Sequence, residues 1–139
     1  MIATGGRPRS YPGIPDELCI TSDDLFSLEK DPGTTLVVGG GYIAIECAGF
    51  LAGLGKEVHL LNRSTFLRTM DQDMAEKIVE QLEEEGVNAY TSTKVLGVKL
   101  LQDGRKQVDL EVNKKAKSIV VDTIMVAIGR DCNPAGLKV

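Results

Sequence analysis

The sequence has few of the features that mark several common classes of protein. Its three cysteines, Cys19, Cys47 and Cys132, are widely separated and form neither a CxxC pair nor a metal-ligand pattern. It contains no apolar run long enough to span a bilayer, and we expect no signal peptide at Met1. Its formal net charge is −4, whereas a nucleic-acid surface needs a basic field. We therefore expect reduced cysteines, no metal site, no membrane segment, no nucleic-acid partner and a cytoplasmic location, with a mitochondrial one left open.

The sequence does contain a regular alternation of strand-like and helix-like segments. The first 30 residues are rich in turn signals and are expected to be irregular, apart from a short helix over 25–28 behind a cap at 21–24. Short apolar runs predict strands at 35–38, 58–61, 87–90 and 123–128. Apolar residues at helical spacing predict helices at 42–54 and 71–85. The predicted buried faces are Ile43, Cys47, Phe50, Leu51 and Leu54 in the first helix and Met74, Ile78 and Leu82 in the second.

The pattern changes after the second helix. β-branched runs at 95–100, 108–112 and 118–121 are separated by turn residues, and Asp103-Gly104 is a hairpin signal. These runs predict an antiparallel meander before the last strand. The order of segments predicts an α/β fold, namely a Rossmann-like parallel sheet flanked by helices with an antiparallel β-meander.

A glycine-rich run lies between the first predicted strand and the first predicted helix. Gly39-Gly40-Gly41-Tyr42-Ile43-Ala44 fits G-x-G-x-x-A. In this motif the first glycine permits a tight turn, the second lets the backbone approach a pyrophosphate, and the final small residue lets helix and strand pack closely. The helix N-terminus adds unpaired N–H groups and a partial positive charge. The motif predicts a dinucleotide site, the alternative being a glycine turn with a purely structural role.

The residues after the second strand indicate which dinucleotide is bound. NAD sites usually carry Asp or Glu there for the ribose 2′-hydroxyl, whereas this chain has Asn62, followed by Arg63 and Ser64, with Arg68 nearby. Two guanidinium groups and a hydroxyl are suited to bind a 2′-phosphate through charge-assisted hydrogen bonds. We therefore predict NADP(H) rather than NAD(H). The alternative is that Arg63 and Arg68 are merely solvated loop cations.

Several runs resemble a known group of flavoproteins. The run IATGGRP at 2–8 resembles the segment that leads from the FAD domain to the NADPH domain in two-dinucleotide flavoproteins, and 126–130 resembles the returning strand end. Runs at 22–28, 46–53 and 70–75 are similar to those of large thioredoxin reductases, in a frame shared with glutathione and thioredoxin-glutathione reductases. The resemblance to this pyridine nucleotide-disulfide oxidoreductase family covers essentially the whole chain. Gly41, where a serine is frequent, and Asn62, where a small apolar residue is usual, depart from the thioredoxin reductase pattern.

The resemblance implies roles for individual residues. Tyr42 would lie over the flavin and move aside for nicotinamide, and Glu46 would sit near the nicotinamide and pair with a lysine of the FAD domain. Both share a helix stripe with Gly49 and Gly53, which another backbone is expected to approach closely. Without the resemblance, Tyr42 would be an ordinary first-turn aromatic and Glu46 a solvated charge. The expected cofactor-binding residues are Gly39, Gly40, Gly41, Tyr42, Ile43, Glu46, Asn62, Arg63, Ser64, Arg68, Ile128, Gly129 and Arg130, with no catalytic residue in this chain.

The resemblance also implies how a longer parent enzyme would be organised. Residues 1–30 would lead in from an FAD domain, 31–130 would bind NADPH, and 131–139 would lead back. The parent, expected to be a homodimer with an interface domain, would pass hydride from NADPH to FAD, then to a Cys-x4-Cys disulfide, and electrons to thioredoxin or glutathione. This chain alone is expected to bind nucleotide but to reduce no disulfide. The alternatives are a glutathione reductase-type domain, a domain of an NADH-dependent flavoprotein and a non-catalytic nucleotide-binding module.

Overall fold

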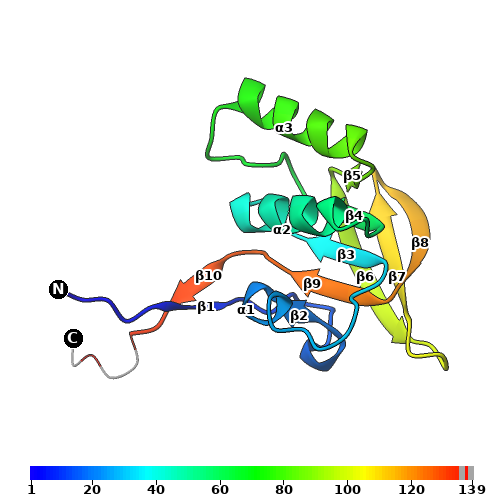
Figure 1. Ribbon diagram of the computed structural model, residues 1–139, viewed down its shortest axis with the longest axis horizontal. Helices are drawn as coiled ribbons and strands as arrows, with labels where there is room; N and C mark the ends of the chain where they lie inside the picture. The colour runs from blue at the N-terminus through cyan, green and yellow to red at the C-terminus, as the bar shows by residue number, and fades with distance from the viewer. Residues whose placement is uncertain (135–136, 138–139) are drawn as a thin grey trace.

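A computed structural model describes residues 1–134 and 137, and within them the chain folds as a layered α/β structure (Figure 1). Its central layer is a parallel sheet with the strand order β2-β9-β3-β4-β5. Because β3, β4 and β9 consist mainly of buried apolar residues, they form the covered centre that a parallel sheet requires. The strands are β2 (Ile20–Thr21), β3 (Thr35–Val38), β4 (Val58–Leu61), β5 (Asn88–Tyr90) and β9 (Thr123–Val126).

Helices cover one face of this sheet and the meander covers the other. Side chains alternate along the strands, so Val37 packs toward the helices, whereas Leu36 and Val38 pack toward the meander. The predicted fold class is confirmed, with its parallel sheet, flanking helices and antiparallel meander. The helices are α1 (Ser22–Leu25), α2 (Tyr42–Gly53) and α3 (Gln72–Glu84), and the meander strands are β6 (Thr93–Leu100), β7 (Lys106–Val112) and β8 (Lys115–Val121). None of the described helices combines the length and apolarity needed to cross a bilayer.

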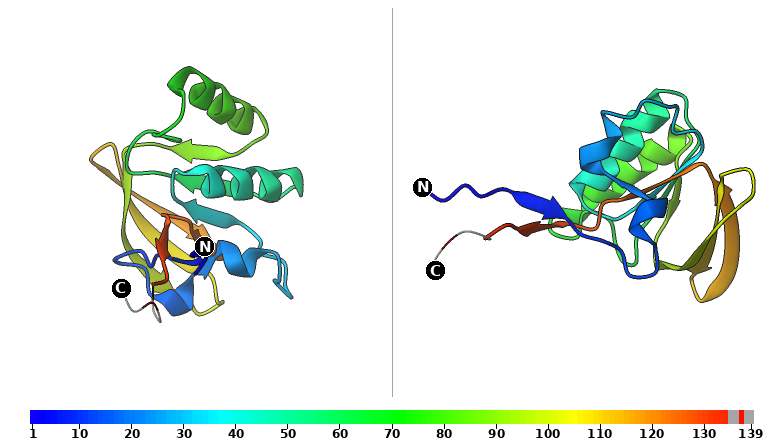
Figure 2. Two further views of the ribbon diagram at one scale, coloured as in Figure 1. Left: turned by 90° about the vertical axis from the view of Figure 1, so that its left-hand side faces the viewer. Right: turned by 90° about the horizontal axis from the view of Figure 1, so that it is seen from below.

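The first part of the leading segment 1–30 runs beside residues 130–134, away from the body of the fold (Figure 2). There β1 (Gly6–Pro8) pairs antiparallel with β10 (Arg130–Cys132), a 3-10 helix (Asp16–Leu18) follows β1, and β2 joins the sheet edge beside β9. The prediction that residues 1–30 are irregular is therefore wrong at β1 and β2. Their partners lie far along the chain, and no local pattern reveals such pairing. Of the trailing segment 131–139, residues 135, 136, 138 and 139 lie outside the described residues.

The first helix begins earlier than predicted. The Thr21 hydroxyl accepts a hydrogen bond from the Asp23 N–H (3.3 Å), and the Asp24 carboxylate accepts one from the Thr21 N–H (2.8 Å), which together form a capping box. The bonds from Thr21 lower the pKa of Asp24. The helix ends at the buried Leu25, so the residues that were predicted to be helical after it lie beyond α1.

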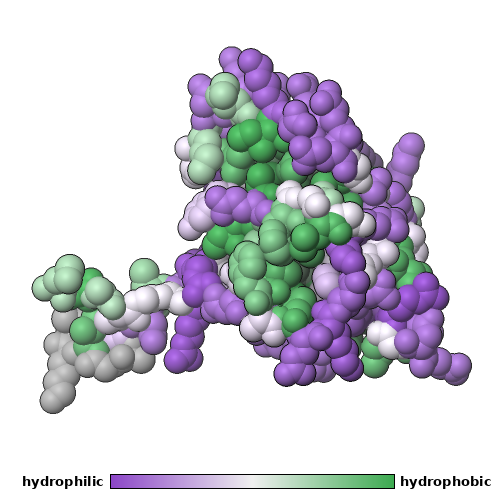
Figure 3. Space-filling model, in the orientation of Figure 1, coloured by the Kyte–Doolittle hydropathy of each residue, from purple (hydrophilic) through white to green (hydrophobic). Residues whose placement is uncertain are grey.

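The predicted buried face of α2 is only partly right. Cys47 and Leu51 are buried, and burial raises the pKa of the Cys47 thiol, but Phe50 and Leu54 are 43% and 59% exposed. The Phe50 ring instead lies 5.2 Å from that of the exposed Phe26, and Figure 3 shows apolar surface over α1 and α2. The helix is apolar around most of its circumference, so periodicity alone does not identify the side that faces the sheet. The buried residues of α2 are Ala44, Ile45, Cys47, Ala48 and Leu51.

The inward face of α3 also differs from the prediction. Leu82 is buried as predicted, but Met74 and Ile78 are 57% and 40% exposed, because the helix turns Ala75 and Val79 toward the core instead. A Cβ atom on Gly49 would lie 3.2 Å from the Leu82 side chain, so α3 covers α2 at that glycine. Within the described residues, the bare stripe of α2 is therefore approached by a side chain and not by another backbone.

Candidate nucleotide-binding cleft

A cleft of about 560 Å³ opens where β3, β4 and β9 end. The carboxyl ends of parallel strands are where ligands bind in open α/β sheets. Four parts of the chain form most of its walls, namely the glycine turn, the loop after β4, the chain after β9 and the leading segment, and Thr93 of β6 also lines it. The lining residues are 9, 11–12, 38–42, 61–65, 67–70, 93 and 127–129.

The glycine turn is fixed to the strands on either side of it. The Gly39 N–H donates to the Leu61 carbonyl (2.9 Å), and the Ala127 N–H donates to the Val38 carbonyl (2.8 Å). Gly39 has φ +151°, and a Cβ atom there would collide with the Ala127 carbonyl. Nothing lies within 4 Å of the corresponding point on Gly41, which precedes α2 without a side-chain cap. The N-terminal turn of α2 thus presents N–H groups and open space, as a pyrophosphate site requires.

The loop after β4 is held in a defined shape beside this turn. The Asn62 amide nitrogen donates to the Thr65 carbonyl (2.7 Å), and the Leu67 N–H donates to the Gly40 carbonyl (2.7 Å). Leu67 is buried and has φ +47°, and the Gln72 amide donates to its carbonyl at 3.1 Å. These contacts keep the intervening loop residues on the cleft wall.

The charged residues that line the cleft are all arginines. They are Arg9, Arg63 and Arg68, and no Asp or Glu lines the cleft in the part of the chain that the structure describes. Arg9 is paired with Asp131 (2.5 Å), and the hydrogen bond to this carboxylate raises the pKa of Arg9. Neither Arg63 nor Arg68 forms an ion pair within residues 1–134 and 137. Their charges are therefore available to an anionic ligand, although the chain as a whole has a net charge of −4.

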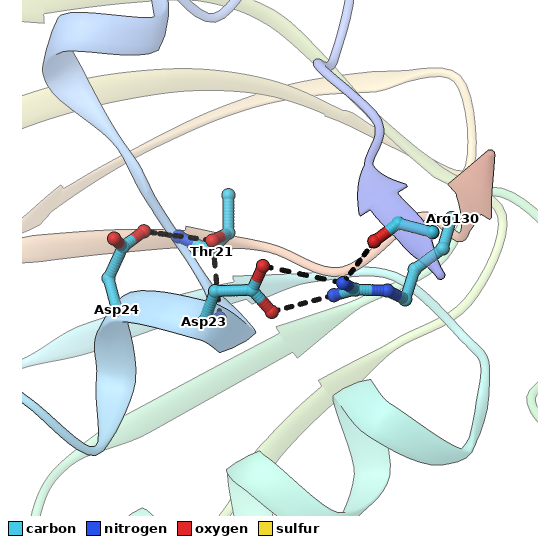
Figure 4. Close-up of polar contacts among 5 residues, drawn as sticks. Thr21, Asp23, Asp24 and Arg130 are labelled. Atoms are coloured by element: carbon cyan, nitrogen blue, oxygen red, sulfur yellow. Dashed lines mark hydrogen bonds and ion pairs between the residues drawn. The ribbon is translucent and has the colours of Figure 1, made fainter. Parts of the chain in front are cut away.

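Ten of the thirteen predicted cofactor-binding residues line this cleft, and three do not. Ile43 is half-buried and packs against the core, and Glu46 is exposed on α2. Arg130 is not among the lining residues: its guanidinium donates to the Asp23 carboxylate at 2.7 Å (Figure 4) and to the Gly6 carbonyl at 2.6 Å. The bond to Asp23 raises the pKa of Arg130. In this structure Arg130 joins α1 to the β1–β10 ribbon.

Several lining residues were missed from the sequence. Arg9, Tyr11 and Pro12 come from the leading segment. The Arg9 N–H donates to the Gly129 carbonyl (3.1 Å), and the Tyr11 hydroxyl accepts a hydrogen bond from the Val95 N–H (3.3 Å). These bonds join segments that are distant in sequence, so no local signal marks the three residues as part of the cleft.

The whole chain, residues 1–139, matches the protein family described as pyridine nucleotide-disulphide oxidoreductase. The chain belongs to this family. Its curated relatives include three thioredoxin reductases, and the matched region spans about a quarter of the length of each. Mitochondrial thioredoxin reductase 2 of Drosophila melanogaster is 46% identical over 94% of this chain and 26% of the relative. Thioredoxin reductase SEP1 of Emiliania huxleyi is 44% identical over 94% and 27%, and thioredoxin reductase of Plasmodium falciparum is 44% identical over 99% and 25%.

Membership of the pyridine nucleotide-disulphide oxidoreductase family implies flavin and nicotinamide cofactors. The cleft fits the nicotinamide dinucleotide in three respects. It has open space and helix N–H groups beside Gly41, it carries arginines and no acid among its described lining residues, and it lies at the carboxyl ends of parallel strands.

Proposed function

We propose that this chain is the NADPH-binding domain of a FAD-dependent disulfide reductase of the thioredoxin reductase type. The proposal rests on one observation: in the cleft a glycine turn lies beside the segment 62–68, and the only charged residues of that segment, Arg63 and Arg68, form no ion pair among the described residues. The names of the similar relatives support the thioredoxin branch.

The cleft residues divide into two groups along the bound dinucleotide. Gly40, Gly41 and the first turn of α2 hold the pyrophosphate through N–H groups. Arg63, Ser64 and Arg68 hold the 2′-phosphate, where guanidinium groups form paired, charge-assisted hydrogen bonds.

At the other end of the cleft, Tyr42, Ile128 and Gly129 face the nicotinamide portion. Glu46, exposed on the same helix as Tyr42, faces the FAD domain. Bound NADPH supplies a hydride to FAD in the parent enzyme, while these residues orient the nucleotide and exclude water. The parts of the parent that hold FAD, the redox-active disulfide and the interface domain are its partners, with thioredoxin or glutathione as the acceptor. The isolated chain binds nucleotide and reduces no disulfide.

Isothermal titration calorimetry with 2′,5′-ADP and 5′-AMP tests the nucleotide assignment. Wild type binds 2′,5′-ADP at least about tenfold more tightly, because charge-assisted bonds to the extra phosphate contribute roughly 1.5–3 kcal/mol. Arg63→Ala and Arg68→Ala each lower that preference and leave 5′-AMP binding unchanged. Arg105→Ala, which removes an exposed arginine of the meander hairpin, is the matched control. Equal affinities of wild type for the two ligands contradict NADP(H) selectivity, and absence of binding contradicts the nucleotide site itself.

A further inference from the structure

Asn62 lies at the junction of β4, the glycine turn and the arginine loop, the segment 62–68 that carries Arg63 and Arg68. The residue was expected to bind cofactor, but its side chain is turned toward the protein. We propose that Asn62 is a positioning residue, whose amide fastens the arginine loop to the glycine turn and thereby sets selectivity for a 2′-phosphate. This inference rests on the proposed function.

The backbone of Asn62 is fixed on both sides. Its N–H donates to the carbonyl of Tyr90, the last residue of β5 (2.9 Å), and its carbonyl accepts from the N–H of Thr93, the first residue of β6 (3.0 Å). The side chain is therefore held over Gly40, where any Cβ atom would overlap the Asn62 amide. From that place the amide nitrogen reaches the Thr65 carbonyl at 2.7 Å.

The far end of the arginine loop is anchored independently. Phe66 and Leu67 are buried in the core, and the Leu67 N–H donates to the Gly40 carbonyl (2.7 Å). Loss of the Asn62 amide consequently releases only 63–65. Arg63 and Ser64 lie inside that stretch, whereas Arg68 lies beyond the second anchor. The inference therefore couples Asn62 to Arg63 and not to Arg68.

The chemistry of the contact requires a donor. The Thr65 carbonyl is an acceptor, so a carboxylate at position 62 would place one acceptor against another. Such a carboxylate turns away from Thr65 and into the cleft, where it repels a 2′-phosphate and accepts from a 2′-hydroxyl. Exchanging the amide nitrogen of Asn62 for an oxygen, as Asn62→Asp does, thus changes the expected selectivity from a 2′-phosphate to a 2′-hydroxyl.

The test measures 2′,5′-ADP and 5′-AMP affinities of the 139-residue chain by calorimetry. Asn62→Leu keeps the branched shape of the side chain but has no donor, and we expect it to lower 2′,5′-ADP affinity about fivefold while 5′-AMP affinity changes less than about twofold. Asn62→Asp brings the ratio of the two affinities close to one or below it. Gln107→Leu, which removes an amide of β7 bonded to Asp109, is the control and leaves both affinities unchanged. Asn62→Ala is measured in the same way. If part of a variant is unfolded, the ratio of its 2′,5′-ADP and 5′-AMP affinities is unaffected, because both ligands bind the same folded fraction.

Double variants separate positioning from direct contact. Combined with Arg63→Ala, Asn62→Leu adds little further loss of 2′,5′-ADP affinity, whereas with Arg68→Ala the two losses multiply. The inference is overturned if the loss of affinity in Asn62→Leu is independent of both Arg63→Ala and Arg68→Ala. It is also overturned if Asn62→Leu leaves the ratio of the two affinities unchanged, which includes an equal loss for both ligands. A wild type without preference for 2′,5′-ADP overturns the proposed function instead.

Discussion

Replacing Gly39 by alanine is expected to lower the free energy of unfolding much more than the same replacement at Gly41. The two glycines lie two residues apart in one motif, yet a Cβ atom on Gly39 would strike the backbone carbonyl of Ala127 and lie 3.3 Å from the Cβ of Ala44. The Ala127 carbonyl belongs to a segment fixed by the bond from the Ala127 N–H to Val38, so it cannot move aside cheaply.

The magnitude follows from two separate costs. The φ of +151° at Gly39 is unfavourable for an L-residue by about 1–3 kcal/mol, and overpacking costs about 1–3 kcal/mol more. The total of roughly 2–6 kcal/mol should lower the melting temperature by roughly 10 °C or more. At Gly41 the space is open, and the cost of about 1 kcal/mol or less comes from the poorer N-cap that alanine provides.

Thermal and urea unfolding followed by circular dichroism measures both variants, and calorimetry with 2′,5′-ADP measures their binding. Gly41→Ala should keep most of its stability but lose affinity, because its methyl group occupies the space proposed for the pyrophosphate. An equal loss of stability at both positions would refute the reasoning, since it would mean that the collision with Ala127 does not determine the requirement for glycine.

Three further outcomes follow from other contacts. Gly40→Ala should destabilise the fold by about 1–3 kcal/mol in wild type but by clearly less in an Asn62→Ala background, because the added methyl overlaps the Asn62 amide; additive urea-unfolding energies would contradict this coupling. Burial lowers the pKa of His59 below its ordinary 6.5, despite the opposing charge of Glu57, so the unfolded chain takes up the proton first. Stability should therefore fall as pH decreases from about 6.5 toward that lower pKa, and less steeply in His59→Gln, as urea midpoints at several pH values will show. Thr21→Val should remove the hydroxyl half of the capping box and cost about 1 kcal/mol locally, seen as faster amide exchange in α1 while exchange in β3 and β4 stays unchanged.

The sequence alone predicted the fold class and the centre of the candidate site, because both depend on local patterns. The apolar run of β3, the glycines after it and the helical spacing of α2 are contiguous, and a strand, tight turn and helix in that order have few alternative arrangements. The missing acid at position 62 and the arginines that follow are likewise visible in the linear order. The roles proposed for these residues remain predictions.

Other features were decided only by tertiary structure. Arg9 and Tyr11 reach the cleft because β1 pairs with β10 and because Tyr11 accepts a bond from Val95, contacts between residues distant in sequence. The ion pair of Arg130 with Asp23 likewise joins residues that lie far apart in the sequence.

The packing of α2 is a second case of this kind. Its sequence is apolar on nearly every side, so only the position of the sheet and of α3 determined that Phe50 lies outside and Ala48 inside. Local sequence specifies which turns and elements form, whereas the free energy of burial, shared among distant segments, determines which of their surfaces meet.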